Sequence, residues 1–547
     1  MKTPILGSSY VARSVNAADS RMVNLFPELV PEGGKEPAFL QRAPGLRLLA
    51  TLGTGPVRGL WSFSNSAAYS FAVSGNTLYK ITTSWVATAI GTVAGTGPVS
   101  MSDNGTQLFI AANGPSYIYN TSTNVFAQIT DPDFPGAVTV GYLDGYFVFN
   151  PPNSQQVWVT SLLDGLSVDP LDFASAEGSP DGLVALIVDH REAWLFGSNS
   201  VEVWYDAGTA DFPLQRIQGA FNEIGCAAAY SVARLDNGLF WLGSDARGRG
   251  IVYRANGYNG QRISTHAVEW HIQQYGNLSD AIGYTYQQDG HAFYVLIFPS
   301  ANTTWVYDVA TQAWHERAGW YNGDFTRHRS NCQMSFNNEI VVGDYQNGNI
   351  YAFDLDVYAD NGAEQRWLRS WRALPTGQNT LLRTTQHSLQ LDCETGVGLN
   401  LYPAYDAQDL IAENGDLIIA EYVQNDITTE AGDELTTEAG DGFELIADVP
   451  DYPIPFEPPM YLTTTSYPAA PGYNPQVMLR WSDDGGHNWS NEHWTSIGRI
   501  GNFGKRAFWR RLGMTLKIRD RVYEVSGTDP VKIAIMGAEL RASPTNA

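Results

Sequence analysis

Residues 482–489 read SDDGGHNW and have the spacing of an Asp box, S-x-D-x-G-x-x-W. Its four positions are held by Ser482, Asp484, Gly486 and Trp489. In such a turn the carboxylate accepts hydrogen bonds from backbone amides, the glycine allows a positive φ, and the tryptophan packs under the loop. Sialidases carry several Asp boxes, so the motif is consistent with a structural hairpin turn or with a glycosidase. We predict a structural turn, because the sequence has one complete match and shows no arginine cluster with a tyrosine nucleophile.

Residues 499–511, RIGNFGKRAFWRR, combine basic and aromatic side chains and form a candidate partner-contact strip. Its basic members are Arg499, Lys505, Arg506, Arg510 and Arg511. Such a pattern suits stacking on bases and contact with phosphates. It equally suits a loop and strand whose aromatic residues are core and whose arginines pair with surplus acids. The acidic chain favours this second interpretation. If the strip does contact a partner, an acidic protein fits it as well as a nucleic acid does.

No motif for catalysis, a cofactor or a metal accompanies these two stretches. The sequence contains no G-x-x-x-x-G-K-[ST], G-x-S-x-G or H-E-x-x-H pattern, and its nine histidines are scattered. Cys226, Cys332 and Cys393 are odd in number and far apart, which predicts free buried thiols rather than disulfides or metal ligands. We therefore expect a protein that is not an enzyme and that binds neither a cofactor nor a metal.

An acidic stretch at 406–451 contains a tandem repeat, TTEAGDEL at 428–435 followed by TTEAGDGF at 436–443. Clustered carboxylates raise a calcium hypothesis, but the Asp-x-Asp-x-Asp-Gly loop of a calcium site is absent. We predict a small, solvated β insertion that is negatively charged.

The elements that position these residues are predicted to be strands. The chain has 547 residues, 53 glycines and 12% aromatic residues, which favours an all-β fold with many turns. The net charge of −24 argues against nucleic-acid binding by counterion release and against an anionic membrane surface. No apolar run approaches the ~20 residues that cross a bilayer. Residues 1–10 lack the apolar core of a secretion signal, so synthesis in the cytosol is expected.

The stretch 180–206 shows the predicted architecture most clearly. An apolar run at Leu183–Val188, a second run at Ala193–Phe196 and an alternating pattern from Val201 to Tyr205 predict three consecutive strands. The connection at 197–200 contains Gly and Asn, which tolerate positive φ in a hairpin. Such a sheet cannot bury its own apolar faces, so it needs similar neighbours.

A similar unit recurs every 40 to 54 residues or so, with an apolar strand before an aliphatic-aromatic pair. The pairs are Leu78-Tyr79, Ile118-Tyr119, Val157-Trp158, Val203-Trp204, Val252-Tyr253, Val306-Tyr307 and Ile350-Tyr351. This period predicts a β-propeller of about seven blades, whereas two stacked sandwiches would give no reason for it. Residues Phe39–Leu49 are predicted to complete the last blade, because ring closure removes exposed sheet edges.

The pattern divides the chain into an N-terminal docking arm at 1–36, the propeller at 37–355, a linker at 356–380 and a C-terminal β-sandwich-like domain at 381–547. The acidic insertion interrupts this last domain. Its predicted strands are His387–Leu391, Met478–Trp481, Arg510–Ile518 and Lys532–Arg541. Leu512, Met514, Leu516 and Ile518 alternate with other residues, which predicts that one face of the third strand is core.

Short motifs are spread over nearly the whole chain. They are NAAD at 16–19, LFP at 25–27, PGL at 44–46, VRGL at 57–60, LYK at 78–80, GTGPVSM at 95–101, SPDGL at 179–183, FGS at 196–198, SDDG at 482–485 and KRAFWRRLG at 505–513. Together and in this order they resemble the packaged-DNA stabilisation (tail hub) proteins of short-tailed bacteriophages. The acidic insertion departs from the family pattern, so nothing carries over to it.

The resemblance implies a structural virion protein that forms a homohexameric ring beneath the portal and its adaptor ring. Such a hub closes the channel, retains packaged DNA, and anchors tailspikes or tail fibres and a central needle or plug. The resemblance also implies a place in the virion tail, assembly in the host cytoplasm, and DNA that passes during genome ejection without sequence-specific binding. The alternative is a sialidase-like propeller glycoside hydrolase or a glycan-binding tail component, which turnover of capsular or sialylated glycans would favour.

Overall fold

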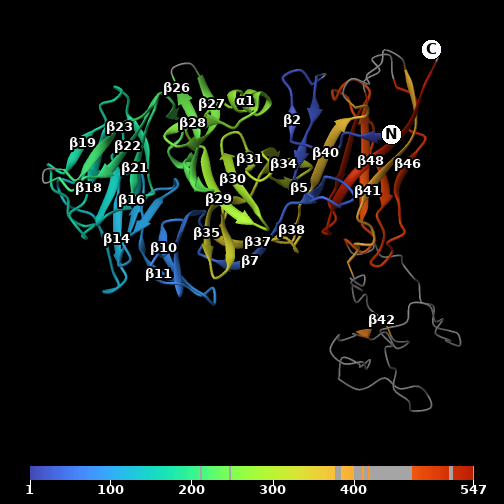
Figure 1. The fold of residues 1–547 in the computed structure, drawn as a ribbon. Helices are drawn as coiled ribbons and strands as arrows, with labels where there is room; N and C mark the ends of the chain where they lie inside the picture. The colour runs from blue at the N-terminus through green and yellow to red at the C-terminus, as the bar shows by residue number, and fades with distance from the viewer. Residues whose placement is uncertain are drawn as a thin grey trace.

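Residues 57–354 fold into consecutive antiparallel sheets, and most of their strands are neighbours in the sequence (Figure 1). The computed structural model describes residues 1–15, 17–209, 212–245, 248–375, 383–399, 410–411, 417–418, 471–515 and 521–545. Within these residues the consecutive sheets number seven. No helix of the described residues is both long and apolar enough to cross a membrane.

The strands of the first four sheets run in simple sequence order. The first sheet contains β8 (Val57–Ser62), β9 (Tyr69–Ser74), β10 (Thr77–Thr82) and β11 (Ala87–Thr92). The second contains β12 (Ser100–Asp103), β13 (Gln107–Ala111), β14 (Ser116–Asn120) and β15 (Val125–Gln128). The third contains β16 (Thr139–Leu143), β17 (Tyr146–Asn150), β18 (Gln156–Val159) and β19 (Phe173–Ser175). The fourth contains β20 (Leu183–Asp189), β21 (Glu192–Gly197), β22 (Val201–Asp206) and β23 (Leu214–Asn222).

The last three sheets are less regular. The fifth contains β24 (Gly225–Cys226), β25 (Ala233–Leu235), β26 (Gly238–Asp245), β27 (Gly248–Asn256) and β28 (Asn259–Arg262). The sixth begins with β29 (Ile282–Gln288), β30 (His291–Phe298), β31 (Thr303–Asp308) and β32 (Ala313–Glu316). The seventh contains β35 (Ser330–Phe336), β36 (Glu339–Asp344), β37 (Asn349–Asp354) and β7 (Gly45–Thr51).

The seven sheets form a closed ring. Their first strands contact one another in the order β8, β12, β16 and β20, and later β25, β29 and β35. The 3-10 helix η1 (Ala229–Ser231) links β20 to the fifth sheet, and β35 returns to β8. This arrangement is a β-propeller, as the repeat predicts. Each aliphatic-aromatic pair of the repeat lies in the third strand of its sheet, which is covered on both sides by neighbouring strands.

The ring is closed by a strand from the N-terminal part of the chain. β7 pairs antiparallel with β37, with Leu48 opposite Tyr351. The prediction that residues near Phe39–Leu49 complete the last blade agrees with this pairing, although β7 begins at Gly45. The preceding strand, β6 (Ala38–Arg42), belongs to a different sheet.

The stretch 180–206 forms β20, β21 and β22 as predicted, but its second turn has another cause. Neither Gly197 nor Asn199 has a positive φ. Instead, the Asp181 carboxylate accepts hydrogen bonds from the Asn199 amide at 2.6 Å, the Ser200 amide at 3.1 Å and the Ser200 hydroxyl at 2.9 Å. A side chain that precedes the hairpin therefore holds this turn.

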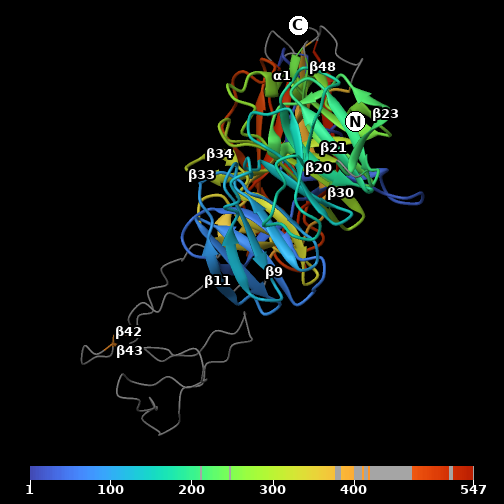
Figure 2. The ribbon, with the colours of Figure 1, turned by 90° about the vertical axis from the view of Figure 1, so that its left-hand side faces the viewer.

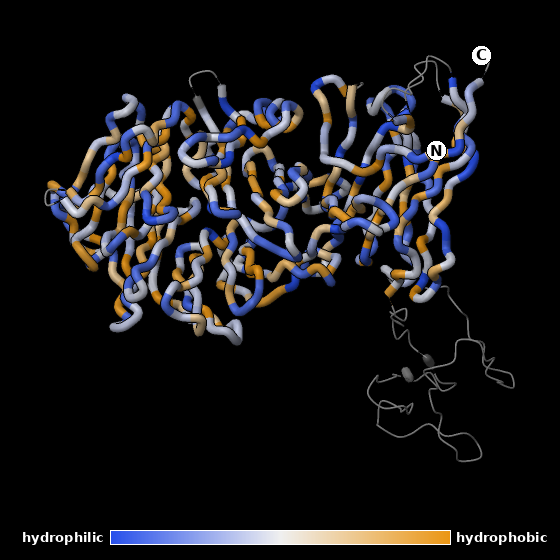
Figure 3. The backbone as a smooth tube through the Cα atoms, in the orientation of Figure 1, coloured by the Kyte–Doolittle hydropathy of each residue, from blue (hydrophilic) through white to orange (hydrophobic). Residues whose placement is uncertain are grey.

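The rest of the described chain is a β-sandwich beside the propeller. One sheet has the order β46 (Ala507–Arg510), β41 (Thr384–Cys393), β48 (Ala534–Pro544), β6 and β5 (Leu25–Leu29), with β1 (Lys2–Thr3) paired to β48. The other has the order β4 (Met22–Val23), β40 (Trp367–Arg372), β47 (Val522–Gly527), β44 (Gln476–Ser482) and β45 (His493–Ser496). Trp371, Leu389 and Tyr523 lie in the core between them. Hydrophobic and hydrophilic segments alternate along the strands of both parts (Figure 3).

The two parts lie side by side in Figure 1 and one behind the other in Figure 2, so the molecule is elongated. The N-terminal residues join them. β4 pairs parallel with β32 of the sixth blade, through Val23 and Glu316, and antiparallel with β40 of the sandwich. The segment at 1–36 therefore contributes β1, β4 and β5 to this protein's own sandwich.

Short elements lie around this junction. They are β2 (Tyr10–Val11), β3 (Asp19–Ser20), α1 (His266–Gln273), β33 (Ala318–Tyr321), β34 (Asp324–Arg327), β38 (Ala359–Asp360) and β39 (Ala363–Glu364). The region 356–380 thus contains β38, β39 and β40, and β40 is a strand of the sandwich core.

The structure differs from the strand predicted at 510–518 and does not describe the acidic repeat. Of the strand predicted at Arg510–Ile518, β46 includes Arg510 alone, because Arg511 has a φ of 58° and turns the chain; Leu516 and Ile518 lie outside the described residues. Leu512 is buried, but Met514 is 45% exposed, so the predicted core face does not continue along these residues. The acidic repeat at 428–443 lies outside the described residues; within 406–451 only β42 (Leu410–Ile411) and β43 (Leu417–Ile418) are described, and they pair.

Candidate interaction site

The Asp-box turn connects β44 to β45 in the sandwich. Asp484 Oδ1 accepts hydrogen bonds from Ser482 Oγ at 2.7 Å, the His487 amide at 3.1 Å and the Asn488 amide at 2.8 Å. The Gly486 amide donates to Ser482 Oγ at 2.8 Å. These donors, Ser482 first among them, hold the pKa of Asp484 well below its ordinary value. The carboxylate is therefore occupied by its own turn.

The turn also receives the N-terminal segment. A Cβ atom built on Gly486, whose φ is 104°, would lie 2.2 Å from Asp19 Oδ2 and 2.9 Å from Val15. Only glycine fits this close approach. Burial raises the pKa of Asp19 to about 6. Trp489 is half-buried, and the Arg480 guanidinium lies 4.9 Å from its ring centroid. The Asp box thus acts here as a docking point within the molecule.

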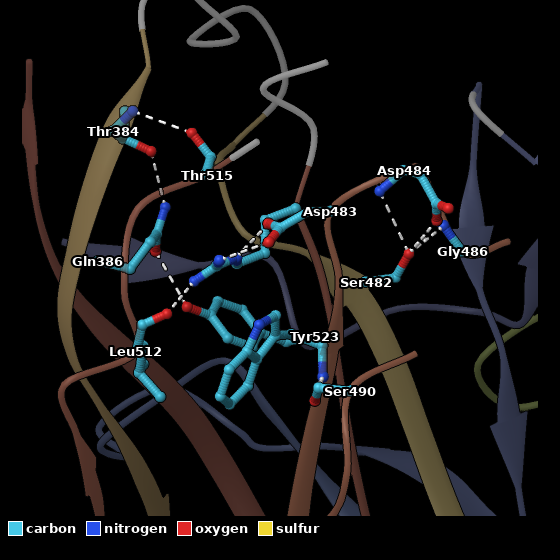
Figure 4. A network of polar contacts seen from close by, with 12 residues as sticks. Thr384, Gln386, Ser482, Asp483, Asp484, Gly486, Ser490, Leu512, Thr515 and Tyr523 are labelled. Carbon is cyan, nitrogen blue, oxygen red and sulfur yellow. Dashed lines mark hydrogen bonds and ion pairs between the residues drawn. The ribbon is translucent and has the colours of Figure 1, made fainter. Parts of the chain in front are cut away.

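Beside the turn, a buried ion pair fixes the inside of the sandwich (Figure 4). Arg521 donates from Nε and Nη2 to the two oxygens of Asp483, at 2.6 and 2.8 Å, and from Nη1 to the Leu512 carbonyl at 2.7 Å. The Tyr523 hydroxyl donates to Gln386 Oε1 at 3.0 Å. Each of these side chains forms hydrogen bonds with a neighbouring strand or loop. The network positions backbone and presents no free nucleophile.

The basic strip lies on the surface of the same domain, in β46, in the loop before it and in Arg511 directly after it. Arg499, Lys505, Arg506, Arg510 and Arg511 are all exposed. Within the described residues, none of the five forms an ion pair with a carboxylate. The interpretation in which these residues neutralise surplus acids of the same chain therefore does not hold for the described part of it.

The aromatic residues of the strip differ from one another. Trp509 is buried and donates from Nε1 to the His493 carbonyl at 2.8 Å, which ties β46 to β45. Phe508 is half-buried and lies 5.0 Å from the Arg510 guanidinium. Phe503 is 76% exposed, so the prediction that the aromatic residues are core is wrong for it. Its carbonyl accepts a hydrogen bond from Thr395 Oγ1 at 3.0 Å, which holds the loop in place.

Two further apolar residues belong to this surface. Trp494 in β45 and Ile500 in the following loop are both more than half exposed. The strip predicted from the sequence begins at 499 and omits Trp494. A sequence signal that covers both Trp494 and Ile500 is the local charge, because residues 493–515 contain five basic residues and no acidic one. We call Trp494, Ile500, Phe503 and the five basic residues the basic face.

The propeller has a hollow of about 660 Å³ on the face that carries the turns between first and second strands. Its lining is mostly polar and includes Asp189, His190, Arg234, Asn237 and Gln333. His190 Nε2 donates to Asn237 Oδ1 at 2.7 Å, and Nδ1 lies 2.8 Å from Asp189 Oδ2. The hydrogen bond to Asp189, then that to Asn237, raises the pKa of His190. These contacts link blades and leave no nucleophile beside a free base.

The turn that carries His190 has a strained backbone. His190 and Arg191 have φ values of 49° and 61°, although neither is a glycine or an asparagine. Arg191 Nη2 donates to Asp144 Oδ1 of the preceding blade at 2.7 Å. The two side chains therefore join the fourth blade to the third and to the fifth, which accounts for the unusual turn.

Metal and thiol chemistry find little support in the described residues. No group of three or more His, Cys, Asp or Glu side chains among them is placed to hold a metal ion. Cys226, Cys332 and Cys393 are free; Cys226 is buried and the other two are half-buried. Burial raises the pKa of Cys226 to about 11 and those of Cys332 and Cys393 to about 12, so none is an activated thiolate.

Comparisons with known proteins agree with this architecture. A family model described as the β-propeller of bacteriophage P22 Gp10 matches residues 1–358. A second model, described as the β-sandwich of the same protein, matches residues 460–543. A search of curated proteins found no match.

Solved structures that the comparison matched include the computationally designed Ika8 protein, which is 12% identical, with a TM-score of 0.36, over 57% of this chain and 99% of that one. A streptogramin B lyase is 9% identical, with a TM-score of 0.38, over 56% and 97% of the two chains. The virginiamycin B lyase from Staphylococcus aureus is 10% identical, with a TM-score of 0.38, over 55% and 97%. At these TM-scores the similarities support no conclusion about function.

Proposed function

The chain belongs to the phage stabilisation family represented by bacteriophage P22 Gp10, and from this premise we propose that it is the tail hub of a virion. A structural phage protein of this family is a virion component. The proposal goes further: the protein closes the channel below the portal and its adaptor ring, retains packaged DNA, and anchors tailspikes or tail fibres and a needle or plug.

The observation that carries this proposal is the way one N-terminal segment builds both parts. β7 closes the propeller, β1, β5 and β6 extend one sheet of the sandwich, and β4 pairs with both parts. A molecule joined in this way holds its two surfaces at a fixed distance. Such rigidity suits a protein that positions other proteins and needs no moving catalytic part.

Side-chain contacts at the junction support the same conclusion. Asn24 donates from Nδ2 to the Ala318 carbonyl at 2.8 Å and to the Arg366 carbonyl at 2.7 Å, and its Oδ1 accepts from the Ala318 amide at 2.9 Å. Arg21 pairs with Glu316 of the sixth blade through two hydrogen bonds, at 2.9 and 2.7 Å. Hydrogen bonds of buried Asn24 and half-buried Arg21 thus hold the junction.

The charge of the chain fits a channel component. At a net charge of −24 the surface repels phosphates, so DNA would pass without adhering. We propose that six copies form the ring in the tail, that assembly takes place in the host cytoplasm, and that contacts with DNA are independent of sequence. A strongly positive lumen in the assembled ring would contradict this part of the proposal.

Electron microscopy of purified particles tests the proposal directly. We expect six copies of this chain at the tail vertex, below the portal and adaptor. Particles assembled without it should package DNA and then lose it, which nuclease protection measures. Normal DNA retention in its absence would contradict the proposed role, and turnover of capsular or sialylated glycans by purified protein would favour the glycosidase alternative.

A further inference from the structure

One region of the propeller lacks positive charge. Residues 81–190 contain ten acidic residues and no lysine or arginine. They include the second and third sheets, which lie at the end of the molecule away from the sandwich (Figure 1). The basic face, with five basic residues and no acidic one between residues 493 and 515, lies at the other end. The elongated molecule therefore has an acidic region at the propeller end and a local basic patch on the sandwich, although the sequence of the sandwich domain as a whole is acidic.

The acidic region carries an exposed apolar loop. Residues 160–172 connect β18 to β19, and we call them the leucine loop. Leu162, Leu163, Leu166 and Leu171 are exposed there, and Leu171 is 76% exposed. Exposed large apolar residues that gather in one place mark interaction sites. Asp164 and Asp169 stand between these leucines and Asp172 follows Leu171; no described lysine or arginine pairs with them.

The leucine loop is held in its conformation by the neighbouring blade. The Gly165 amide donates to Gln107 Oε1 at 2.8 Å, and the Val168 amide donates to Asp131 Oδ2 at 3.2 Å. The Leu163 amide donates to the Gly145 carbonyl at 2.8 Å, and Leu163 has a φ of 58°. A leucine in this region is strained, so the surrounding contacts must hold it there. The loop is thus preorganised with its leucines facing solvent.

The basic face is preorganised as well. The Gly396 amide donates to the Ile497 carbonyl at 3.0 Å, and the Gly501 amide donates to the Gly396 carbonyl at 3.1 Å. Together with the hydrogen bond from Thr395 to the Phe503 carbonyl, these contacts fix the loop that exposes Ile500 and Phe503. An ordered surface loses little conformational entropy on binding.

We propose that copies of this chain associate head to tail, with the leucine loop of one copy docked on the basic face of the next. The two surfaces are complementary, because each places exposed apolar residues among charges of one sign and the two signs are opposite. They lie at opposite ends of the molecule, so one chain cannot pair them with each other (Figure 1). Such a heterologous contact closes into a ring when the rotation between copies permits.

This inference rests on the proposed structural role and names the partner of the basic face within it. A second copy fits better than a nucleic acid, because Trp494, Ile500 and Phe503 add apolar anchors that need an apolar counterpart. The leucine loop supplies that counterpart, and its carboxylates complement the arginines and lysine.

The test is a charge exchange in the full chain, with mass measured by sedimentation velocity. The wild type should associate with rising concentration at low salt and less so at high salt. Lys505→Glu with Arg506→Glu in one variant, and Asp169→Lys with Asp172→Lys in the other, should each weaken self-association about tenfold or more. An equimolar mixture of the two variants should associate again, because each reversed surface then meets its complement.

Controls separate charge from folding. Arg13→Glu with Arg249→Glu, and Glu223→Lys with Asp289→Lys, change exposed residues outside both surfaces by the same charges and should leave association unchanged. Circular dichroism and the melting temperature report whether any variant has lost its fold. Phe503→Ala and Leu171→Ser should each weaken association about tenfold at low and at high salt, because they remove apolar contacts.

Three results would overturn the inference: a monomer at every concentration, association that neither charge reversal alters, or a mixture that fails to recover. Loss of duplex DNA binding by Lys505→Glu with Arg506→Glu, with self-association intact, would also overturn it and assign the basic face to nucleic acid. If the inference fails while microscopy still finds the wild-type chain at the tail vertex, the proposed function stands. Absence from the vertex would remove the proposed function itself.

Discussion

The propeller and the sandwich are both antiparallel β structures, yet the chain builds them in opposite ways. In the first six blades of the propeller, the four or five strands of each sheet are successive in the sequence. In the sandwich, one sheet joins strands from residues 2–42, 384–393, 507–510 and 534–544. The propeller is therefore assembled from local pairings, and the sandwich depends on residues that are hundreds of positions apart.

The two parts must therefore gain their stability from different contacts. A blade gains its backbone hydrogen bonds from short turns, so its formation needs little loop closure. The sandwich has no such independence, because β5 and β6 extend one of its sheets and β4 lies at the edge of the other. Changes in the N-terminal segment should therefore affect the sandwich far more than blades one to five.

The largest expected effect is on folding itself. A fragment of residues 45–358 retains every strand of the seven propeller sheets, so it should give a β-type circular dichroism spectrum and a cooperative melt. A fragment of residues 359–547 lacks β1, β4, β5 and β6 and should show no cooperative melt. Independent folding of the second fragment would contradict this contrast, and restored folding on addition of a peptide of residues 1–44 would support it.

A single buried residue should show the same asymmetry. Arg42 is 1% exposed and donates to the carbonyl of Tyr358 at 3.0 Å and of Val531 at 2.9 Å, among other acceptors on both sides of the junction. Burial lowers the pKa of its guanidinium to about 10. Arg42→Met leaves these acceptors without a donor and should lower the free energy of unfolding by about 3 kcal/mol.

Hydrogen exchange would locate that loss. Amides of the sandwich should exchange faster in Arg42→Met, while those of the first four blades should keep their protection. Arg13→Met, at an exposed position of the same segment, should change stability by less than ~0.5 kcal/mol. Equal loss of protection in all blades would show that the two parts form one cooperative unit.

A pH dependence should belong to the propeller. His328 is fully buried beside β35, and its Nδ1 lies 2.7 Å from Ser330 Oγ. Burial first, then the charge of Arg317, lowers its pKa to about 3 from the ordinary 6.5. The unfolded chain takes up a proton below pH 6.5 that the folded chain refuses until pH 3, so this group removes about 1.4 kcal/mol of stability for each pH unit of acidification.

The difference between the wild type and His328→Gln isolates this group, because other buried residues titrate in both. We expect the variant to lose less stability than the wild type between pH 6 and pH 4, as measured by urea denaturation at each pH. Parallel stability curves for the two proteins would show that His328 keeps an ordinary pKa.

The smallest effect should be confined to the Asp box. Asp484→Asn should speed hydrogen exchange of the His487 and Asn488 amides and leave the melting temperature unchanged, since the turn lies at the surface. Asp483→Ala is the matched comparison, because it leaves the buried Arg521 without its carboxylate and should be clearly destabilising. Similar melting temperatures for the two variants would contradict the structural roles assigned to them.

The contrast between local and remote strand pairing also explains which parts of the fold could be predicted from the sequence. Val157-Trp158 and the other pairs mark third strands, because a local repeat leaves a period in the sequence. Trp367–Arg372 is a core strand of the sandwich, but it lies in the region predicted as a linker, since its partners Val522–Gly527 and Met22–Val23 are remote. No local pattern reports a remote pairing.

The candidate site shows a similar limit. Basic residues interleaved with aromatic ones identified Arg499, Lys505, Arg506, Arg510 and Arg511 as a strip, and the structure places all five at the surface. Exposure of Phe503 was not predictable, because an aromatic residue beside a strand is usually core. It follows from hydrogen bonds between the loop and residues 395–396, which only the folded chain brings together.

β4 has a mechanical consequence. A pull that draws the sandwich away from the propeller would load the two-residue strand Met22–Val23, which meets the sixth blade through one pair, Val23 and Glu316. The ion pair between Arg21 and Glu316 reinforces that point. Under tension the contact between β4 and β32 should therefore rupture first, while the propeller and the sandwich stay folded. The strength of this contact should then set the force at which the two parts separate.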